Sequence, residues 1–283
     1  MPCRLIGKLL KRFGAKELSQ SEVINLATKT GGAEAPWRPY GAHRLDKIQA
    51  EALEYLLQAQ TPLAAAVLLD QYNGALSKAL KSRKNTRKLK GSAGFGLALT
   101  QPRRILILGK PNVGKSTLFN ALLGQDRAIT HHLPGTTRDT IEDILAIGGF
   151  PFVLVDTAGL RKSTQDAIEK IGMAYARKEI PKADVILLVV EKDEITESDA
   201  VLRSLKVKTQ APVIVVLNKA DLIHKSQISN HKSQIPTIKV SALKRTGIDR
   251  LRKEVLKACK LVKFRHKPGQ PIIFSREQLS LIY

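Results

Sequence analysis

A short glycine-rich segment constrains the fold of this chain more than any other feature. The apolar residues Ile105–Leu108 have the composition of a buried strand, and the sequence GKPNVGKS follows at once as Gly109–Ser116. After this segment, Leu118, Phe119 and Leu122 recur at the spacing of an amphipathic helix. A strand, a GxxxxGKS loop and a helix in this order form a phosphate-binding loop. The chain is therefore expected to contain an α/β domain in which this loop leaves the carboxyl end of a strand.

The residue types in this loop suit the binding of a nucleotide polyphosphate. Glycines allow backbone N–H groups to point toward the β-phosphate, and the N-terminus of the following helix adds a favourable dipole. Lys115 is expected to place a positive charge beside the β- and γ-phosphates, and the Ser116 hydroxyl to bind Mg²⁺. The loop residues predicted to bind nucleotide are Asn112, Val113, Gly114, Lys115, Ser116 and Thr117.

Short β-branched runs and helix-length segments alternate beyond the loop, which predicts a doubly wound sheet. Gly148 and Gly149 separate the second and third runs, so these two strands are expected to form an antiparallel hairpin. The remaining strands should be parallel with right-handed crossovers. The expected fold class is α/β: a mixed, mostly parallel six-stranded sheet with helices on both faces, attached to a small helical domain. The predicted strands are Ile105–Leu108, Thr140–Ile147, Phe152–Asp156, Val185–Val190, Val213–Leu217 and Thr237–Val240.

A second motif predicts which base the nucleotide carries. The sequence NKAD, Asn218–Asp221, follows the apolar run Val213–Leu217 and so lies at the carboxyl edge of the sheet, where such folds bind ligands. The Asp221 carboxylate can accept hydrogen bonds from guanine N1 and N2, whereas adenine offers neither donor in that arrangement. Lys219 is expected to lie along the base. The residues predicted to bind the guanine end of GTP or GDP are Asn218, Lys219, Asp221, Ser241 and Ala242.

Two further segments have the positions of the parts that respond to the γ-phosphate. The sequence DTAG, Asp156–Gly159, ends the third predicted strand, which places Asp156 near Mg²⁺ and the Gly159 N–H near the γ-phosphate. Thr137, in the polar segment before the second strand, is the expected second hydroxyl ligand of Mg²⁺. These residues predict a magnesium-dependent enzyme that hydrolyses GTP to GDP and phosphate. The residues of the two segments predicted to bind nucleotide are Thr136, Thr137, Asp156, Thr157, Ala158 and Gly159.

The charge of the chain points to a polyanionic partner. The sequence has 47 lysines and arginines against 25 aspartates and glutamates, a formal net charge of +22, as expected of a protein that binds RNA or ribosomes. Lys81–Lys90 and Arg250–Lys267 concentrate basic residues with few aromatic residues among them, which favours contact with the phosphate backbone over base stacking. The alternative for both stretches is a solvated helix face. A second hypothesis for the whole chain is an RNA- or ribosome-binding assembly factor whose GTP site only regulates docking.

Cysteine content and hydropathy restrict the class of protein. Cys3 and Cys259 are the only cysteines, so a secreted disulfide framework is excluded. The apolar runs are too short to cross a bilayer. We therefore expect a cytoplasmic protein without membrane contact.

The composition also changes along the chain and predicts four segments. Residues 41–80 carry apolar residues at helical spacing, which predicts a helical hairpin whose second helix has Thr61 as its N-cap and Pro62 at its first position. Lys81–Lys90 and the following Gly91–Gly94 are expected to form a helix end or a linker. The expected segments are an N-terminal extension (1–40) interpreted as the remnant of a lost domain, a helical hairpin domain with a basic linker (41–100), a GTPase domain (103–262) and a C-terminal tail packing on the helical domain (263–283).

Several motifs in sequence order resemble the tRNA-modification GTPase family (MnmE, also called TrmE). They are Gly109–Asn120, Pro134–Asp139, Asp156–Arg161, Ile168–Gly172 and, outside the GTPase domain, Leu45–Ala52 and Gln71–Leu80. The resemblance covers most of the chain from about Gly41 to Leu261. It implies a GTPase domain inserted into a helical domain and a part in modifying wobble uridines of tRNA. It also implies that two GTPase domains form a dimer face to face in the presence of K⁺.

The resemblance implies roles for individual residues as well. Asn112 matches the family's K⁺ ligand, with Thr136 in the same site. Glu169 matches the glutamate that positions the attacking water, and the alternative is a surface glutamate paired with Arg161 or Lys170. The catalytic residues expected on this basis are Glu169, Lys115 and Gly159. Neither the family's folate-binding domain nor its C-terminal Cys-Ile-Gly-Lys signature is recognised, so a shortened member is expected.

Overall fold

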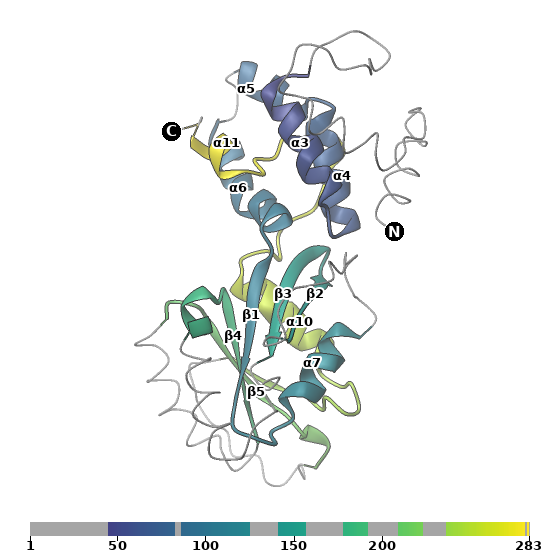
Figure 1. Ribbon diagram of the computed structural model, residues 1–283, viewed down its shortest axis with the longest axis vertical. Coiled ribbons are helices and arrows are strands. Elements are labelled where there is room, and N and C mark those ends of the chain that lie inside the picture. Colours follow the sequence, from purple (N-terminus) through teal and green to yellow (C-terminus); the bar gives the residue numbers. More distant parts are fainter. Residues whose placement is uncertain are drawn as a thin grey trace. The chain divides into compact units, whose positions relative to one another are not determined.

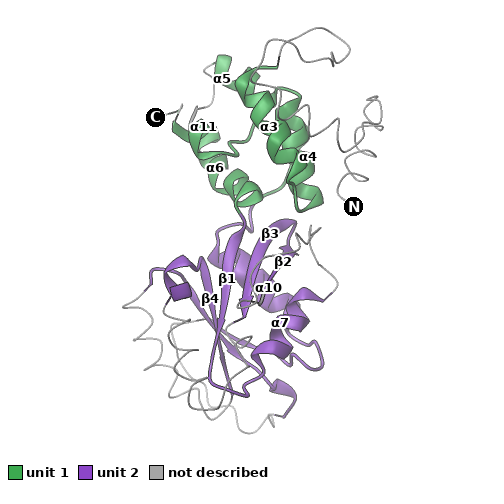
Figure 2. Ribbon diagram, in the orientation of Figure 1, with its two compact units in different colours: residues 1–101, 264–283 green, residues 102–263 purple. Residues whose placement is uncertain are grey.

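The computed structural model describes residues 45–82, 86–124, 141–156, 178–191, 209–222, 236–280 and 282. The chain forms two compact units, unit 1 of residues 1–101 with 264–283 and unit 2 of residues 102–263 (Figure 2). The backbone therefore passes from unit 1 to unit 2 after Gln101 and returns after Lys263. Each unit is described by itself.

Unit 2 is built on a six-stranded sheet (Figure 1). Its strands are β1 (Arg103–Leu108), β2 (Ile141–Ile147), β3 (Phe150–Asp156), β4 (Val185–Val190), β5 (Val213–Leu217) and β6 (Thr237–Lys239). The order across the sheet is β2-β3-β1-β4-β5-β6, in which β2 and β3 are antiparallel and the other pairs are parallel. This confirms the mixed, mostly parallel sheet. The predicted hairpin is confirmed too, because Gly148 and Gly149 have φ values of 58° and 84°, as a two-residue turn between antiparallel strands requires.

A buried apolar cluster lines this sheet, and two helices lie next to it (Figure 1). All six residues of β4 are buried, as expected of a central parallel strand. Side chains of β1, β3, β4 and β5 join in one buried apolar cluster. Helices α7 (Lys115–Leu123) and α10 (Ile248–Ala258) lie next to the sheet (Figure 1), and Arg252 of α10 donates to the Leu122 carbonyl oxygen of α7 at 2.9 Å. This contact holds the two helices side by side.

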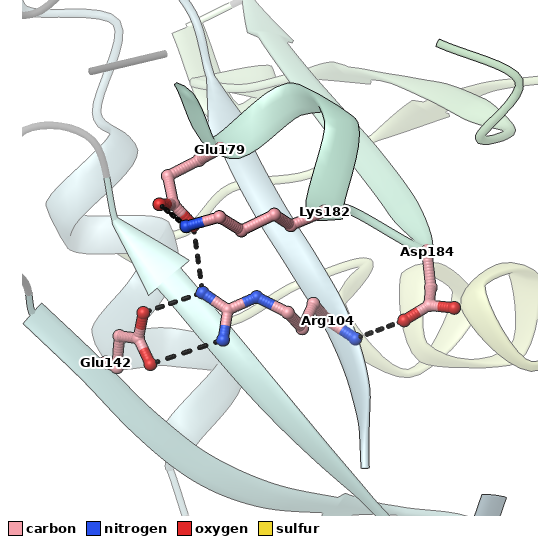
Figure 3. Close-up of polar contacts among 5 residues, drawn as sticks. All are labelled: Arg104, Glu142, Glu179, Lys182 and Asp184. Carbon is pink, nitrogen blue, oxygen red and sulfur yellow. Dashed lines mark hydrogen bonds and ion pairs between the residues drawn. The ribbon is translucent and has the colours of Figure 1, made fainter. Parts of the chain in front are cut away.

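A charged network surrounds Arg104, the second residue of β1, whereas the phosphate loop follows the last residue of that strand. Figure 3 shows the network. Arg104 donates to Glu142 of β2 at 2.7 Å and to Glu179 at 3.0 Å. Lys182, in the 3-10 helix η2 (Ile180–Lys182), donates to Glu179 at 2.7 Å, and the Arg104 amide donates to Asp184 at 2.9 Å. The Glu179 side chain is only 6% exposed. Burial alone would raise the pKa of Glu179, but its hydrogen bonds with Lys182 and Arg104 outweigh burial and hold that pKa below its ordinary value.

Replacing Glu179 with alanine is expected to lower the free energy of unfolding by about 2–3 kcal/mol, because Arg104 and Lys182 both lose a buried, charged acceptor. Folding lowers the pKa of Glu179, so its contribution is complete at neutral pH. The contribution declines below the ordinary pKa of 4.5 and disappears as the pH falls through the folded-state pKa. Urea unfolding followed by circular dichroism at neutral and acidic pH measures both effects.

The matched control is Glu254→Ala in the same unit. It removes a carboxylate that lies 2.9 Å from Lys257, whose side chain is largely exposed, and should cost at most about 1 kcal/mol. Equal losses for the two variants at neutral pH, or a Glu179→Ala loss that persists unchanged in acid, would contradict the role given to Glu179.

Unit 1 consists of helices α3 (Lys47–Leu57), α4 (Pro62–Tyr72), α5 (Ala75–Lys81), α6 (Thr86–Thr100) and α11 (Arg276–Ser280). Asp46 caps α3, because its carboxylate accepts from the Gln49 N–H at 3.0 Å while the Gln49 side chain accepts from the Asp46 N–H. The predicted start of α4 is confirmed: Thr61 accepts from the Ala64 N–H at 3.2 Å and Pro62 follows Thr61. No helix in the described part of the chain is both long and apolar enough to cross a membrane.

The basic, glycine-rich stretch after Lys81 differs from the prediction. The sequence predicted a helix end or a linker over residues 81–94. Helix α5 does end at Lys81, but a second helix, α6, then covers Thr86–Thr100. Glycine lowers helix propensity, so packing must compensate. A Cβ on Gly96 would lie 1.9 Å from the carbonyl oxygen of Ile273, so glycine is what lets the C-terminal segment approach α6 this closely.

The C-terminal segment packs within unit 1. The Gln71 side chain of α4 donates to the Gln270 carbonyl oxygen at 3.1 Å and accepts from the Ile272 N–H at 3.2 Å. Thr100 of α6 donates to the Phe274 carbonyl oxygen at 2.6 Å, and the Phe274 side chain is fully buried. Residues about 200 positions apart in sequence therefore share one core.

Candidate nucleotide-binding site

The phosphate loop leaves β1 at a place where side chains would collide with the sheet. Gly109 has a φ of 152°, and a Cβ there would lie 2.3 Å from the Val189 carbonyl oxygen on β4. Gly114 has a φ of 88°, and a Cβ there would lie 2.3 Å from the Asn218 side-chain nitrogen. Both glycines are therefore required by close approach and by backbone conformation. Their positions explain why the loop can curl over the carboxyl edge of the sheet.

Lys115 begins α7 and bears the positive charge of the loop. Lys115 is 8% exposed, and its Nζ donates to the Lys110 carbonyl oxygen at 2.7 Å, so the ammonium group lies over the loop itself. The N–H groups in the first turn of a helix have no acceptor within that helix, and the helix dipole adds partial positive charge at the same place. An ammonium group, backbone N–H donors and this dipole together favour a bound anion such as a nucleotide phosphate.

Asn218 connects the phosphate loop to the segments predicted to bind the base. Its side-chain Nδ2 donates to the Val113 carbonyl oxygen at 2.9 Å, and its Oδ1 accepts from the Ala242 N–H at 3.1 Å. Its own backbone N–H donates to the Val190 carbonyl oxygen at 3.0 Å. Asn218 is 3% exposed, so these bonds form out of contact with water. Three predicted site residues, Val113, Asn218 and Ala242, are thus brought together by one buried amide.

Asp221 and Ser241 lie at the other end of the site. Asp221 is in the 3-10 helix η4 (Ala220–Leu222), and Ser241 follows β6. A hydrogen bond from Ser241 lowers the pKa of Asp221, so this carboxylate stays ionised at neutral pH. Lys244 lies 3.9 Å from the carboxylate and adds a favourable charge. An ionised carboxylate in this place has the acceptors that guanine N1 and N2 need.

Glu191 is a residue of this region that the sequence did not single out. It directly follows β4, and its carboxylate accepts from the Lys219 Nζ at 2.5 Å. Lys219 has a φ of 56°, a left-handed backbone conformation that turns the chain out of β5. The ion pair with Glu191 fixes the long Lys219 side chain, which the sequence predicted to lie along the base. The available signal was that Glu191 directly follows a wholly apolar strand, at the edge of the sheet where ligands bind.

Two described residues have the chemistry of magnesium ligands. Ser116 is the second residue of α7, and Asp156 is the last residue of β3, 3% exposed. Asp156 pairs in register with Ile107 of β1, two residues before the loop begins at Gly109. A hydroxyl and a carboxylate oxygen are hard ligands, which suit Mg²⁺. The residues present therefore fit this ion.

Six predicted site residues lie outside the described part of the chain: Thr136, Thr137, Thr157, Ala158, Gly159 and Glu169. Their roles stay predictions. Asn112, which the resemblance assigns to K⁺, is exposed on the phosphate loop with a φ of 66°. Thr117 is exposed in the first turn of α7.

Comparison with known proteins identifies the kind of domain that carries this site. A family model described as 50S ribosome-binding GTPase matches residues 104–219. A protein of Aquifex aeolicus named tRNA modification GTPase MnmE is 37% identical over 253 residues, which cover 76% of this chain and 56% of that protein. The protein of the same name from Moorella thermoacetica is 35% identical over 288 residues, covering 84% of this chain and 61% of that protein. The chain thus spans about six tenths of the length of these relatives.

Solved structures with a similar arrangement include the G domain of the T. maritima FeoB iron transporter. It is 26% identical, covers 56% of this chain and 99% of that chain, and has a TM-score of 0.41. Aquifex aeolicus Era bound to GDP·AlF₄⁻ is 29% identical, with 55% of this chain and 56% of that chain covered and a TM-score of 0.42. The family match and the sheet of unit 2 together establish that a GTPase domain is present.

Proposed function

We propose that this chain, a relative of the MnmE tRNA-modification GTPases that contains a GTPase domain, binds GTP with Mg²⁺ and hydrolyses it to GDP and phosphate. The observation that carries the proposal is the Asn218 side chain, which ties the phosphate loop at Val113 to Ala242 beside the predicted base pocket. One buried amide thereby sets the distance between the group that holds phosphates and the group that reads the base.

Each side chain has a separate task in the proposed reaction. Lys115 neutralises charge on the β- and γ-phosphates, and the backbone N–H groups around Gly114 hold the β-phosphate. Ser116 and Thr137, with Asp156 nearby, would hold Mg²⁺, which would further neutralise phosphate charge. Asp221 accepts from guanine and leaves adenine without a partner. Glu169 orients the attacking water, a role supported by the sequence resemblance alone.

The cellular role is proposed from the relatives. Two relatives are named for tRNA modification, and the net charge of +22 suits contact with tRNA. We therefore place the GTPase cycle in a step of tRNA modification in the cytoplasm, with pairing of two GTPase domains in the GTP state. The chain spans only 56% and 61% of those two proteins, so their whole activity is carried over here as a proposal.

Hydrolysis of GTP is expected to be faster in K⁺ than in Na⁺, by roughly tenfold or more. Asn112 and Thr136 would hold the cation, whose charge would offset the negative charge that develops between the phosphates, the task of an arginine finger in other GTPases. Ion size matters because fixed oxygens must replace the hydration shell. Phosphate release at equal ionic strength in KCl and NaCl measures the effect, and sedimentation with GDP and aluminium fluoride measures dimer formation.

Asn112→Ala is the matched variant for this experiment. It should lose the K⁺ stimulation while keeping GTP binding, because Val113, Lys115 and Ser116 remain in place. Equal turnover of the parent chain in the two salts would leave Asn112 as an ordinary loop residue, with the GTPase proposal itself still supported by turnover in either salt.

A second candidate function is an RNA- or ribosome-binding assembly factor whose GTP site regulates docking. The match to a family described as 50S ribosome-binding GTPase favours it. The two hypotheses differ in what the nucleotide controls. An assembly factor changes its affinity for RNA between GTP and GDP, whereas a modification GTPase requires hydrolysis itself. RNA binding measured with GDP and with a non-hydrolysable GTP analogue separates them.

A further inference from the structure

Helix α10 presents a row of basic side chains on the face turned away from the core of unit 2. Its inner face is apolar: Ile248, Leu251 and Val255 are buried, with Leu251 and Val255 fully inaccessible. Arg250, Lys253 and Lys257 are exposed at the i, i+3 and i+7 positions, on the opposite side of the helix. Two further exposed lysines, Lys260 and Lys263, follow within five residues of the helix end. We call these five residues the α10 stripe.

Most of the charge in the α10 stripe is uncompensated. Between residues 248 and 263 there are six cationic side chains and two carboxylates. The carboxylates are already paired, Asp249 with Arg252 at 3.6 Å and Glu254 with Lys257 at 2.9 Å. The side chains of Arg250, Lys253, Lys260 and Lys263 have no ion pair within the described part of the chain. A surface that keeps four cations together without carboxylates costs free energy through repulsion, and a polyanion relieves it.

We propose that the α10 stripe is a binding surface for the phosphate backbone of RNA. It names the contact surface for the RNA partner proposed above and does not depend on GTP hydrolysis. No aromatic residue occurs between positions 248 and 263, so bases have nothing to stack on and the recognised chemistry is the phosphate. A bilayer is disfavoured because the apolar face of α10 is buried in the domain and cannot insert among lipids.

The test is the salt dependence of binding to a short RNA duplex, compared between the full chain and the variant Arg250→Gln/Lys253→Gln/Lys260→Gln. The slope of log K against log salt is negative, and each lost phosphate contact reduces its magnitude by about 0.9, so the slope of the variant should be shallower by about 2.7. Affinity near 0.1 M salt should fall on the order of tenfold or more. GTP turnover of the same variant should match the parent, because none of the three residues lies in the nucleotide site.

Two control variants make the test specific. Lys47→Gln/Lys78→Gln/Arg276→Gln removes the same charge from exposed positions of unit 1 and should leave the slope nearly unchanged. Arg250→Lys/Lys253→Arg/Lys260→Arg keeps the charge of the stripe and should keep the slope, which separates loss of contact from loss of fold. Equal slopes for the parent and the glutamine variant, or equal losses in the two glutamine variants, would overturn the assignment. Binding to phosphatidylserine vesicles that depends on the stripe, without binding to RNA, would also overturn it in favour of a membrane surface.

Discussion

Lys115→Ala is expected to lower GTP turnover at least about a hundredfold, the scale on which a single electrostatic group acts in a transition state. The ammonium group of Lys115 lies over the phosphate loop, 2.7 Å from the Lys110 carbonyl oxygen, and is largely buried. A bound triphosphate adds negative charge at this place, and alanine offers nothing to balance it. Arginine is not an adequate substitute, because a planar guanidinium group differs in size and geometry from the compact ammonium group.

Phosphate release under saturating GTP measures the Lys115→Ala effect, and nucleotide binding measured separately shows whether affinity falls with it. Lys110→Ala is the matched control in the same loop. It removes an exposed lysine side chain but keeps the backbone carbonyl oxygen that accepts from Lys115, so turnover within a few fold of the parent is expected. Normal turnover in Lys115→Ala would refute the phosphate-loop assignment, and equal losses in both variants would show that loop stability rather than charge is measured.

The order and direction of the strands could be predicted because they depend on local patterns. Short apolar runs, the Gly148–Gly149 turn and helix-length spacers specify a mixed sheet with one antiparallel strand at the β2 edge. The start of β3 was predicted two residues late, since Pro151 reads as a break in a strand. Pro151 pairs with Ala146 of β2, while the pairing with β1 begins only at Phe152, so the missing N–H costs nothing on the β1 side.

Features that depend on residues far apart in sequence could not be predicted. The network around Arg104 joins Glu142 and Glu179, which are 38 and 75 positions away. Helix α6 contains glycines that argue against a helix, and only the close approach of Ile273 explains Gly96. The nucleotide site likewise combines features set by local sequence with features that depend on distant residues. Its motifs are local and recognisable, whereas the pairing of Glu191 with Lys219 appears only when β4 and β5 are placed side by side.

Asp221→Asn is expected to reverse the base preference of the site. The Asp221 carboxylate, kept ionised by its hydrogen bond with Ser241, offers two acceptors to guanine N1 and N2. Asparagine keeps one acceptor and replaces the other by an NH₂ donor, which then faces a guanine donor. Xanthine carries a carbonyl oxygen where guanine carries its amino group, so xanthosine triphosphate satisfies the new donor. Affinity for GTP should fall on the order of a hundredfold, and affinity for xanthosine triphosphate should rise.

Competition binding with GTP, inosine triphosphate, xanthosine triphosphate and ATP measures this change in a single experiment. Inosine lacks only the 2-amino group, so the parent chain should bind inosine triphosphate about 10- to 100-fold more weakly than GTP, as expected for one lost hydrogen bond to a charged acceptor. Asp249→Asn, which removes a carboxylate that is 89% exposed on α10, is the matched control and should keep the preference for GTP.

Because the pKa of Asp221 is lowered, the preference of the parent chain for GTP should hold from neutral pH down to about pH 5. If Asp221→Asn still prefers GTP over xanthosine triphosphate, Asp221 does not read the base. The hydrogen bonds of Asn218 would then position the phosphate loop, and a group other than Asp221 would recognise guanine.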